Sequence, residues 1–364
     1  MNKLRGSKVR RSAIASTVVA VTAVAVIGMS GTSFVSPTHA AYTAEAVVQD
    51  NEKAASWTMS TIKLPNAGYA SVYSPSNRAL YILGRDDNSM MIAEPRANAV
   101  SPPLKANLLT SPEAIADDPD HHRLLISTGD GRIVQYSTDT FYFNSFTVSP
   151  VCGGSLVTGL VVHRAIDRVI AVCANSQYVL LNADGVIVGG GSLQGASPSN
   201  IVLTNDDKRL LIGSSGSQHI YTLATLSDDN LSFSSIRSVS SDGTGASGQG
   251  TVVVPVGTDL VVVQDAARGA GSLSLYYTQS HIRLARGLDV GPQPIASGFL
   301  DRDGKLWGFA DNRAVEVDTT QLKSARSIPT GAKPLSGKVA SVDQTTNTVW
   351  VLLENSLVGW MTIP

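Results

Sequence analysis

The stretch AIADDPDHHRLLIS, residues 114–127, contains the pattern that decides the fold. A short apolar segment leads into a polar turn rich in Asp, Pro and His, and a second apolar segment, rich in Leu and Ile, follows at once. Asp and Pro suit the backbone angles of tight turns, whereas branched apolar residues favour strands. The stretch therefore predicts two antiparallel strands joined by a tight turn.

The same pattern recurs along the chain at a nearly constant spacing. Its other instances are SVYSPSNRALYIL from Ser71, LVVHRAIDRVIAV from Leu160, IVLTNDDKRLLIG from Ile201, VVVPVGTDLVVVQ from Val252, SGFLDRDGKLWGF from Ser297 and ASVDQTTNTVWVL from Ala340. Aligned on an apolar residue of the second segment, from Leu80 to Val349, the repeats lie 44, 45, 41, 50, 46 and 43 residues apart. A period near 44 residues is typical of four-stranded propeller blades. The pattern predicts an all-β, seven-bladed β-propeller over residues 57–364.

Further short segments complete most repeats. The predicted third strands are IVQYS from Ile133, YVLL from Tyr178, HIYTL from His219, LSLYY from Leu273 and AVEVD from Ala314; predicted fourth strands include FTVS from Phe146 and ARSIP from Ala325. The last repeat has only three candidate strands, near 339–343, 349–353 and 357–361. We expect Trp57–Leu64 to supply the missing outer strand and close the ring, because closure leaves no long unpaired edge.

Residues 1–40 have the pattern of an export signal. They carry five basic and no acidic side chains, with the basic groups in residues 2–11 and an apolar run over Ala13–Met29. Small side chains precede Ala41, so we expect cleavage between Ala40 and Ala41 and a flexible tether over residues 41–56. A retained membrane anchor and a twin-arginine signal at Arg10-Arg11 are alternatives. The expected location is secreted, periplasmic or in the cell envelope.

Charge and composition narrow the possible partners. The chain is 43% apolar and 16% charged, which is enough apolar residue for a full core. Beyond residue 40, 23 basic side chains face 29 acidic ones, a net charge of −6. Nucleic-acid binding is disfavoured by this sign and by export. We expect a monomer without a nucleic-acid partner.

The two cysteines, Cys152 and Cys173, belong to the same repeat. Cys152 precedes its inner strand and Cys173 ends its second strand, so both are expected toward one face of the propeller. In an exported protein this placement favours a disulfide. Two buried free thiols and a redox pair are the alternatives.

Residues 312–337, NRAVEVDTTQLKSARSIPTGAKPLSG, resemble the YVTN-type β-propeller repeat. The matching residues are Val315, Val317, Asp318, Ile328, Pro329, Gly331 and Pro334, and Tyr81, Trp307 and Trp350 share the aromatic position of the second strand. The resemblance implies the fold only. YVTN-type repeats occur in lactonase-like enzymes, metal carriers, surface-layer modules and scaffolds, so the repeat fixes no chemistry.

Ligands of propellers usually sit over the central channel, on the face formed by the loops that enter each inner strand and those that join strands two and three. Polar residues expected on this loop face are our binding candidates, although they also suit turns and solvent. They are Arg85, Asp86, Glu113, Asp130, Asn175, Asn200, Gln249, Asp265, Arg268, Asp311 and Glu354. Residues 238–250 and 265–272 are Gly-rich loops on the same face, and act either as lids or as tolerated insertions.

Recognisable catalytic chemistry is scarce. The chain lacks HExxH and G-x-S-x-G, and the Gly-rich segment at 185–192 resembles a phosphate loop in composition only. We therefore expect no metal, no cofactor and no catalytic residue. The leading hypothesis is an exported, non-catalytic module that binds a protein, lipid or glycan. Alternatives are a metal-dependent lactonase, using residues such as Glu113, Asn200, Asp130 or Asp311, and a periplasmic metal or lipid carrier associated with an export machine.

Overall fold

The fold is seen in a computed structural model. The structure describes residues 59–363, with gaps at 85–86, 95–96, 148, 194–197, 205–206, 218, 228, 230, 241–247, 251–252, 257–259, 265–271, 278–282, 290–296, 319–322 and 336–339. All of these belong to one compact unit, Thr43–Pro364. The expected signal, its cleavage site at Ala40 and Ala41, and the tether lie outside the described residues.

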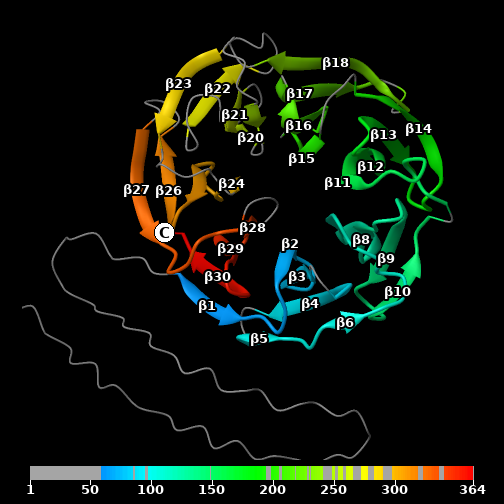
Figure 1. Cartoon of the computed structure of the whole chain (residues 1–364), viewed down its shortest axis with the longest axis horizontal. Helices are drawn as coiled ribbons and strands as arrows, with labels where there is room; N and C mark the ends of the chain where they lie inside the picture. Colours follow the sequence, from blue (N-terminus) through cyan, green and yellow to red (C-terminus); the bar gives the residue numbers. More distant parts are fainter. Residues whose placement is uncertain are drawn as a thin grey trace, which may run out of the picture. The chain divides into compact units, whose positions relative to one another are not determined.

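The described strands form antiparallel sheets arranged as a ring around a common centre, which is a β-propeller (Figure 1). The innermost strands are β2 (Gly68–Ser74), β7 (Ile115–Asp118), β11 (Val157–His163), β15 (Pro198–Leu203), β20 (Val253–Val256), β24 (Ser297–Leu300) and β28 (Ala340–Asp343). The second strands are β3 (Ala79–Gly84), β8 (Arg123–Ser127), β12 (Arg168–Cys173), β16 (Arg209–Ser217), β21 (Leu260–Gln264), β25 (Leu306–Ala310) and β29 (Thr348–Leu353).

Each sheet continues outward through a third strand to an outer strand. The third strands are β4 (Ser89–Glu94), β9 (Ile133–Ser137), β13 (Gln177–Leu181), β17 (His219–Leu226), β22 (Ser272–Tyr277), β26 (Arg313–Asp318) and β30 (Leu357–Thr362). The outer strands are β5 (Ala99–Val100) with β6 (Leu104–Lys105), β10 (Tyr142–Ser145), β14 (Ile187–Ser192), β18 (Phe233–Ser240), β23 (Arg283–Asp289), β27 (Lys323–Pro329) and β1 (Ser60–Lys63). The turns after β7 and β11 hold the short 3-10 helices η1 (Pro119–His121) and η2 (Arg164–Ile166).

The second strands carry most of the core. All six residues of β3 are buried, as are the last five of β12 and of β29. Strands covered on both faces by neighbouring sheets need apolar residues at every position, not only at alternate ones. This explains why the second apolar segment of each repeat is a continuous run, and it confirms the all-β propeller prediction.

The outer strand of the second sheet differs from the prediction. It is β10, Tyr142–Ser145, which pairs with β9 from Tyr142↔Ser137 to Ser145↔Val134, and not a strand starting at Phe146. After Ser145 the ladder breaks, because the backbone N–H groups of Phe146 and Thr147 both donate to the carbonyl oxygen of Ile133. The Phe146 side chain then turns inward and is 7% exposed.

The Gly-rich segment at 185–192 forms the turn into strand β14 and the strand itself. A Cβ on Gly189 would come within 1.8 Å of the Leu231 carbonyl oxygen, and one on Gly190 within 2.7 Å of the Tyr178 carbonyl oxygen. No side chain fits at these two positions without moving backbone. The glycines therefore serve close packing of backbone.

Part of the predicted loop at 238–250 is also strand. Strand β18 runs to Ser240, and β19 (Gly248–Gly250) pairs with β16, with Ser214 opposite Gly250 and Ser217 opposite Gly248. Residues 265–271, in the second predicted loop, lie outside the described residues. Among the residues that are described, no helix has the length and apolar character needed to cross a membrane.

Segments from the two ends of the described chain share one sheet. Strand β1 pairs with β30, from Ser60↔Trp360 to Lys63↔Leu357. The next residue, Leu64, donates its backbone N–H to the Ser356 carbonyl oxygen at 2.7 Å and is 2% exposed. Figure 1 shows β1 on the outer side of β30, with β2 of the next sheet nearby.

Candidate functional site

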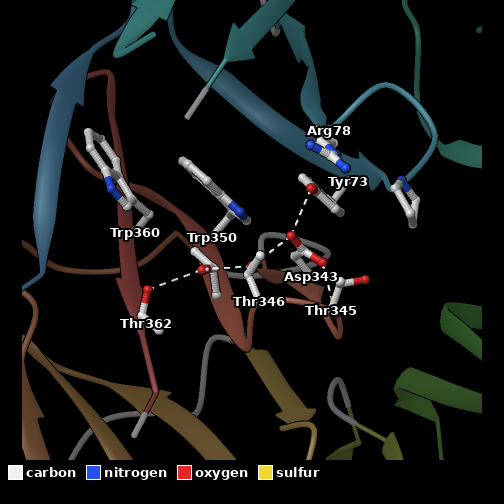
Figure 2. A pocket seen from close by; sticks show the side chains of 10 residues that line it. Tyr73, Arg78, Asp343, Thr345, Thr346, Trp350, Trp360 and Thr362 are labelled. Carbon is white, nitrogen blue, oxygen red and sulfur yellow. Dashed lines mark hydrogen bonds between the residues drawn. The ribbon is translucent and has the colours of Figure 1, made fainter. Parts of the chain in front are cut away.

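A pocket of about 310 Å³ lies between the first sheet and the sheet that contains β28, β29 and β30. We call it the seam pocket (Figure 2). Its lining residues are Tyr73, Pro75, Arg78, Asp343, Thr345, Thr346, Thr348, Trp350, Trp360 and Thr362. They come from the end of β2, the β2–β3 turn, the β28–β29 turn and two strands. Its volume is near the lower end of the range for small-ligand sites, about 300–1,000 Å³.

Two tryptophans form the aromatic side of the seam pocket. Trp350 on β29 and Trp360 on β30 are direct cross-strand partners. Their ring centroids are 5.4 Å apart with an interplanar angle of 24°, so the rings stack. Trp350 is 1% exposed, whereas Trp360 is only partly buried. Trp360 therefore presents aromatic surface that a ligand can reach.

A chain of hydrogen bonds forms the polar side of the pocket. The Tyr73 hydroxyl donates to Asp343 Oδ2 at 2.9 Å, and the Thr346 hydroxyl donates to the same oxygen at 2.6 Å. The hydroxyl oxygens of Thr346 and Thr348 are 3.0 Å apart, and those of Thr348 and Thr362 are 3.2 Å apart. Figure 2 shows this chain running from the first sheet across to β30.

The carboxylate fixes one end of this chain. An ionised carboxylate can only accept, so Tyr73 and Thr346 both donate to Asp343. The chain ends at Thr362, which is exposed, so its hydroxyl can donate to a ligand or accept from one.

Asp343 stays ionised in this setting. Burial raises the pKa of its carboxyl, but hydrogen bonds from Thr346, from Tyr73 and from the backbone N–H of Thr345 outweigh burial, so the net effect lowers the pKa. A carboxylate with a depressed pKa holds no proton at neutral pH and is a poor general acid. Asp343 therefore serves as a fixed acceptor.

The two equivalent tryptophans of the last two sheets differ in one hydrogen bond. In the sheet of β24–β27, Trp307 Nε1 donates to Asp301 Oδ2 at 3.0 Å. Asp343 stands where Asp301 stands in its repeat, but Tyr73 and Thr346 occupy its Oδ2. The Trp350 Nε1 is buried and has no hydrogen-bond partner among the residues that the structure describes. In Figure 2 this nitrogen points away from Trp360, toward the side of the pocket where Thr346 and Asp343 lie.

Arg78 adds a positive charge at the rim. It is exposed in the β2–β3 turn and has a positive φ of 54°. Among the residues that the structure describes, no carboxylate forms a salt bridge with it. Its guanidinium is thus available to an oxygen-rich ligand.

The side chains of two binding candidates, Asp130 and Asn175, form hydrogen bonds that stabilise the turns in which they lie. The carboxylate of Asp130 accepts from the Thr128 hydroxyl at 2.6 Å, and its other oxygen lies 3.2 Å from Arg132 Nε. The Thr128 hydrogen bond, more than the neighbouring Arg132, lowers the pKa of Asp130. Asn175 accepts from the Gln177 backbone N–H at 3.2 Å and donates to the Cys152 carbonyl oxygen at 3.4 Å.

Three further candidates lie on strand ends and turns. Glu113 is partly buried just before β7, and its N–H donates to the Ser127 carbonyl oxygen at 3.0 Å. Glu354 is exposed, 3.5 Å from Lys333 Nζ. Asp311, with φ of 50°, helps to line a second, open pocket of about 470 Å³ beside β26 and β27.

The remaining candidates have no described side chain. Arg85, Asp86, Asp265 and Arg268 lie outside the described residues; Asn200 is on β15 and Gln249 on β19, but only their backbone is described. Among the candidates with described side chains, no contact joins one to another. In the described part of the chain, no group of three or more His, Cys, Asp or Glu side chains is placed to hold a metal ion.

The predicted disulfide between Cys152 and Cys173 is confirmed. Their Cα atoms are 5.9 Å apart, and both residues are buried. The bond ties the segment before β11 to the last residue of β12. It thereby holds the entrance of the third sheet at the loop face.

Sequence reasoning missed the seam pocket. We expected a ligand on the face formed by the loops that join second and third strands. The seam pocket lies instead on the opposite face, where turns join first and second strands. Its residues are separated by up to 289 positions, from Tyr73 to Thr362. A usable signal is present at the end of the chain, where Trp350, Trp360 and four threonines gather within 18 residues.

Comparisons with known proteins support the fold and no more. No protein-family model matches the chain, and no curated protein matches it. In fold, 1784 solved chains match it, so the architecture by itself does not select a function. One is a chain of Kuenenia stuttgartiensis hydrazine synthase, with a TM-score of 0.64 and 12% identity over 83% of this chain and 97% of that one. The YVTN-type resemblance stays a prediction, and the chain is similar to the hydrazine synthase chain as a β-propeller.

Proposed function

We propose that this protein is an exported β-propeller of the cell envelope that binds a partner without chemically changing it. The seam pocket is the observation that carries the proposal. It combines reachable aromatic surface on Trp360 with a carboxylate that is already hydrogen-bonded and ionised. Such a set suits recognition, because sites that bind small molecules pair apolar surface with a few fixed polar groups.

The proposed architecture is a seven-bladed ring closed by strand β1. The pairing of β1 with β30, and the recurrence of the same strand order in each sheet, support it. The repeat pattern of the sequence supports the same number of blades. A closed ring gives a rigid frame, and the seam pocket lies beside the point of closure.

Export is supported by two independent features. The basic and apolar pattern of residues 1–40 is that of a signal segment. The Cys152–Cys173 disulfide suits an oxidising compartment such as the periplasm or the cell exterior. The loop face, with Asp130, Asn175 and Glu354 exposed, is proposed as a second surface for a macromolecular partner.

Affinity capture tests the proposal. The wild type and the Trp360→Ala variant are immobilised and exposed to envelope extract, and bound proteins, lipids and glycans are measured by mass spectrometry. We expect a partner that is enriched on the wild type and lost from the variant. In parallel, lactone hydrolysis is assayed with added Ca²⁺ and with EDTA. Metal-dependent turnover, or capture of nothing by the wild type, would overturn the proposal.

A further inference from the structure

We propose that the seam pocket binds a sugar ring, so that the partner of the proposed binding module is a glycan. This inference rests on the proposed function and adds the class of ligand. Three features of the pocket lead to it: the partly exposed Trp360, the guanidinium of Arg78 at the rim and the exposed Thr362 hydroxyl.

The aromatic surface selects for a ligand with a flat apolar face. The rings of Trp350 and Trp360 stack at an interplanar angle of 24° on neighbouring strands, and Trp350 is fixed by burial. Rigid indole rings provide large contact area at little cost in conformational entropy. The C–H groups on one face of a pyranose ring match such a surface.

The polar groups select for a ligand that both donates and accepts. The guanidinium of Arg78 only donates. By contrast, the hydroxyl of the exposed Thr362 can both donate and accept. Sugar hydroxyls are donors and acceptors at once, so a single ring can satisfy both kinds of group.

The same groups disfavour a cationic ligand. Three aromatic residues and a carboxylate, as in Tyr73, Trp350, Trp360 and Asp343, resemble a site for a quaternary ammonium ion. Here the carboxylate is already engaged by Tyr73 and Thr346, and Arg78 places a positive charge at the rim. Acidic sugars gain from Arg78, so an acidic glycan is expected to bind at least as well as a neutral one.

Calorimetric titration of the full-length protein tests the inference. The probes are oligosaccharides of glucose, of N-acetylglucosamine and of galacturonic acid. We expect saturable binding of at least one probe. Trp360→Ala should weaken that binding by about tenfold or more, because the change removes the central aromatic contact. Arg78→Ala should weaken binding of the acidic probe more than of the neutral ones.

The control is Tyr142→Ala, which removes an aromatic side chain that is 63% exposed on β10 and lies outside the pocket. This variant should bind like the wild type. If Trp360→Ala does not fold, Trp360→Phe decides, since it keeps an aromatic ring at this position and reduces the surface offered to the sugar. Arg78→Ala, in an exposed turn, should fold in either case.

Two results would overturn the sugar site. One is the absence of saturable binding of all three probes at millimolar concentration. The other is binding that Trp360→Ala, Trp360→Phe and Arg78→Ala leave unchanged. If envelope capture still yields a protein or lipid that depends on Trp360, the binding-module proposal stands and only the sugar class is wrong.

Discussion

The hydroxyl of Tyr73 donates a 2.9 Å hydrogen bond to the carboxylate of Asp343, 270 positions further along the chain. Tyr73 is at the end of the first inner strand, and Asp343 is at the end of the last one. The bond therefore crosses the seam where the two ends of the propeller meet. In the neighbouring sheet the equivalent carboxylate, Asp301, accepts from Trp307, whereas the buried Trp350 Nε1 has no partner among the described residues.

Tyr73→Phe tests the contribution of this bond to stability. The variant leaves a buried carboxylate with one donor fewer, and we expect a loss of about 1.5–3 kcal/mol in the free energy of unfolding. Urea unfolding followed by circular dichroism provides the measurement. Tyr142→Phe, which removes an exposed hydroxyl, should match the wild type. Equal stability of the two variants would contradict a role for the bond.

The two equivalent tryptophans should respond differently to the same substitution. Trp307→Phe removes a donor to the buried Asp301 and should cost more than loss of ring volume alone, by about 1–3 kcal/mol. Trp350→Phe removes a donor that has no partner in the described part of the chain and should lack this extra cost. The difference between the two unfolding free energies is the measured quantity. A larger loss at Trp350 than at Trp307 would refute the assignment of the free N–H.

Leu64 tests whether β1 is an integral part of the ring. Leu64 is 2% exposed, so Leu64→Ala should destabilise the whole domain by about 2–5 kcal/mol through loss of buried surface and the cavity that remains. The neighbouring Lys63 is exposed, and Lys63→Ala should change stability by no more than about 0.5 kcal/mol. Both are compared by chemical unfolding. A Leu64 variant as stable as the Lys63 variant would mean that the segment is dispensable.

Reduction of the Cys152–Cys173 disulfide should lower the melting temperature. The bond closes a loop with a sequence separation of 21 residues. Constraining a loop of this size stabilises the folded state by about 3 kcal/mol. For a domain of this length, this free energy corresponds to a shift of about 5 °C in the melting temperature. Scanning calorimetry with and without dithiothreitol measures the shift. The Cys152→Ser/Cys173→Ser double variant should melt at the lower temperature in both buffers.

Asp117 should make stability depend on pH. Burial, followed by the nearby Asp118 and Asp120, raises the pKa of its carboxyl from 3.8 to about 6, against opposing effects of Ser74 and Arg164. Between these values the folded state holds a proton that the unfolded chain has released. The stabilisation from this protonation is complete below pH 3.8 and is lost as pH rises through about 6.

Asp117→Asn should remove this dependence, because an amide does not titrate. We expect the melting temperature of the wild type to fall more than that of the variant between pH 4.5 and pH 7, values chosen for the assay on either side of the pKa of about 6. Asp184→Asn, a change at an exposed turn residue, should follow the wild type. Parallel curves for wild type and Asp117→Asn would refute the raised pKa.

Local features of the sequence were sufficient to predict the strands. The predicted third strand IVQYS is β9, Ile133–Ser137, and the three strands expected in the last repeat are β28, β29 and β30. The outer strand of the second sheet was misplaced, because its end depends on two N–H groups that share the Ile133 carbonyl oxygen. This break depends on a hydrogen bond with the neighbouring strand β9, so the local sequence around Phe146 does not reveal it.

The sequence alone determined the repeat, the all-β propeller and the disulfide partners, since turn residues, apolar runs and cysteine placement act over short distances within one repeat. Only the tertiary structure decided where a ligand can bind. Tyr73 and Asp343, whose hydrogen bond forms one wall of the pocket, are 270 residues apart in the chain. They meet only because the first and last inner strands contact each other in the folded protein.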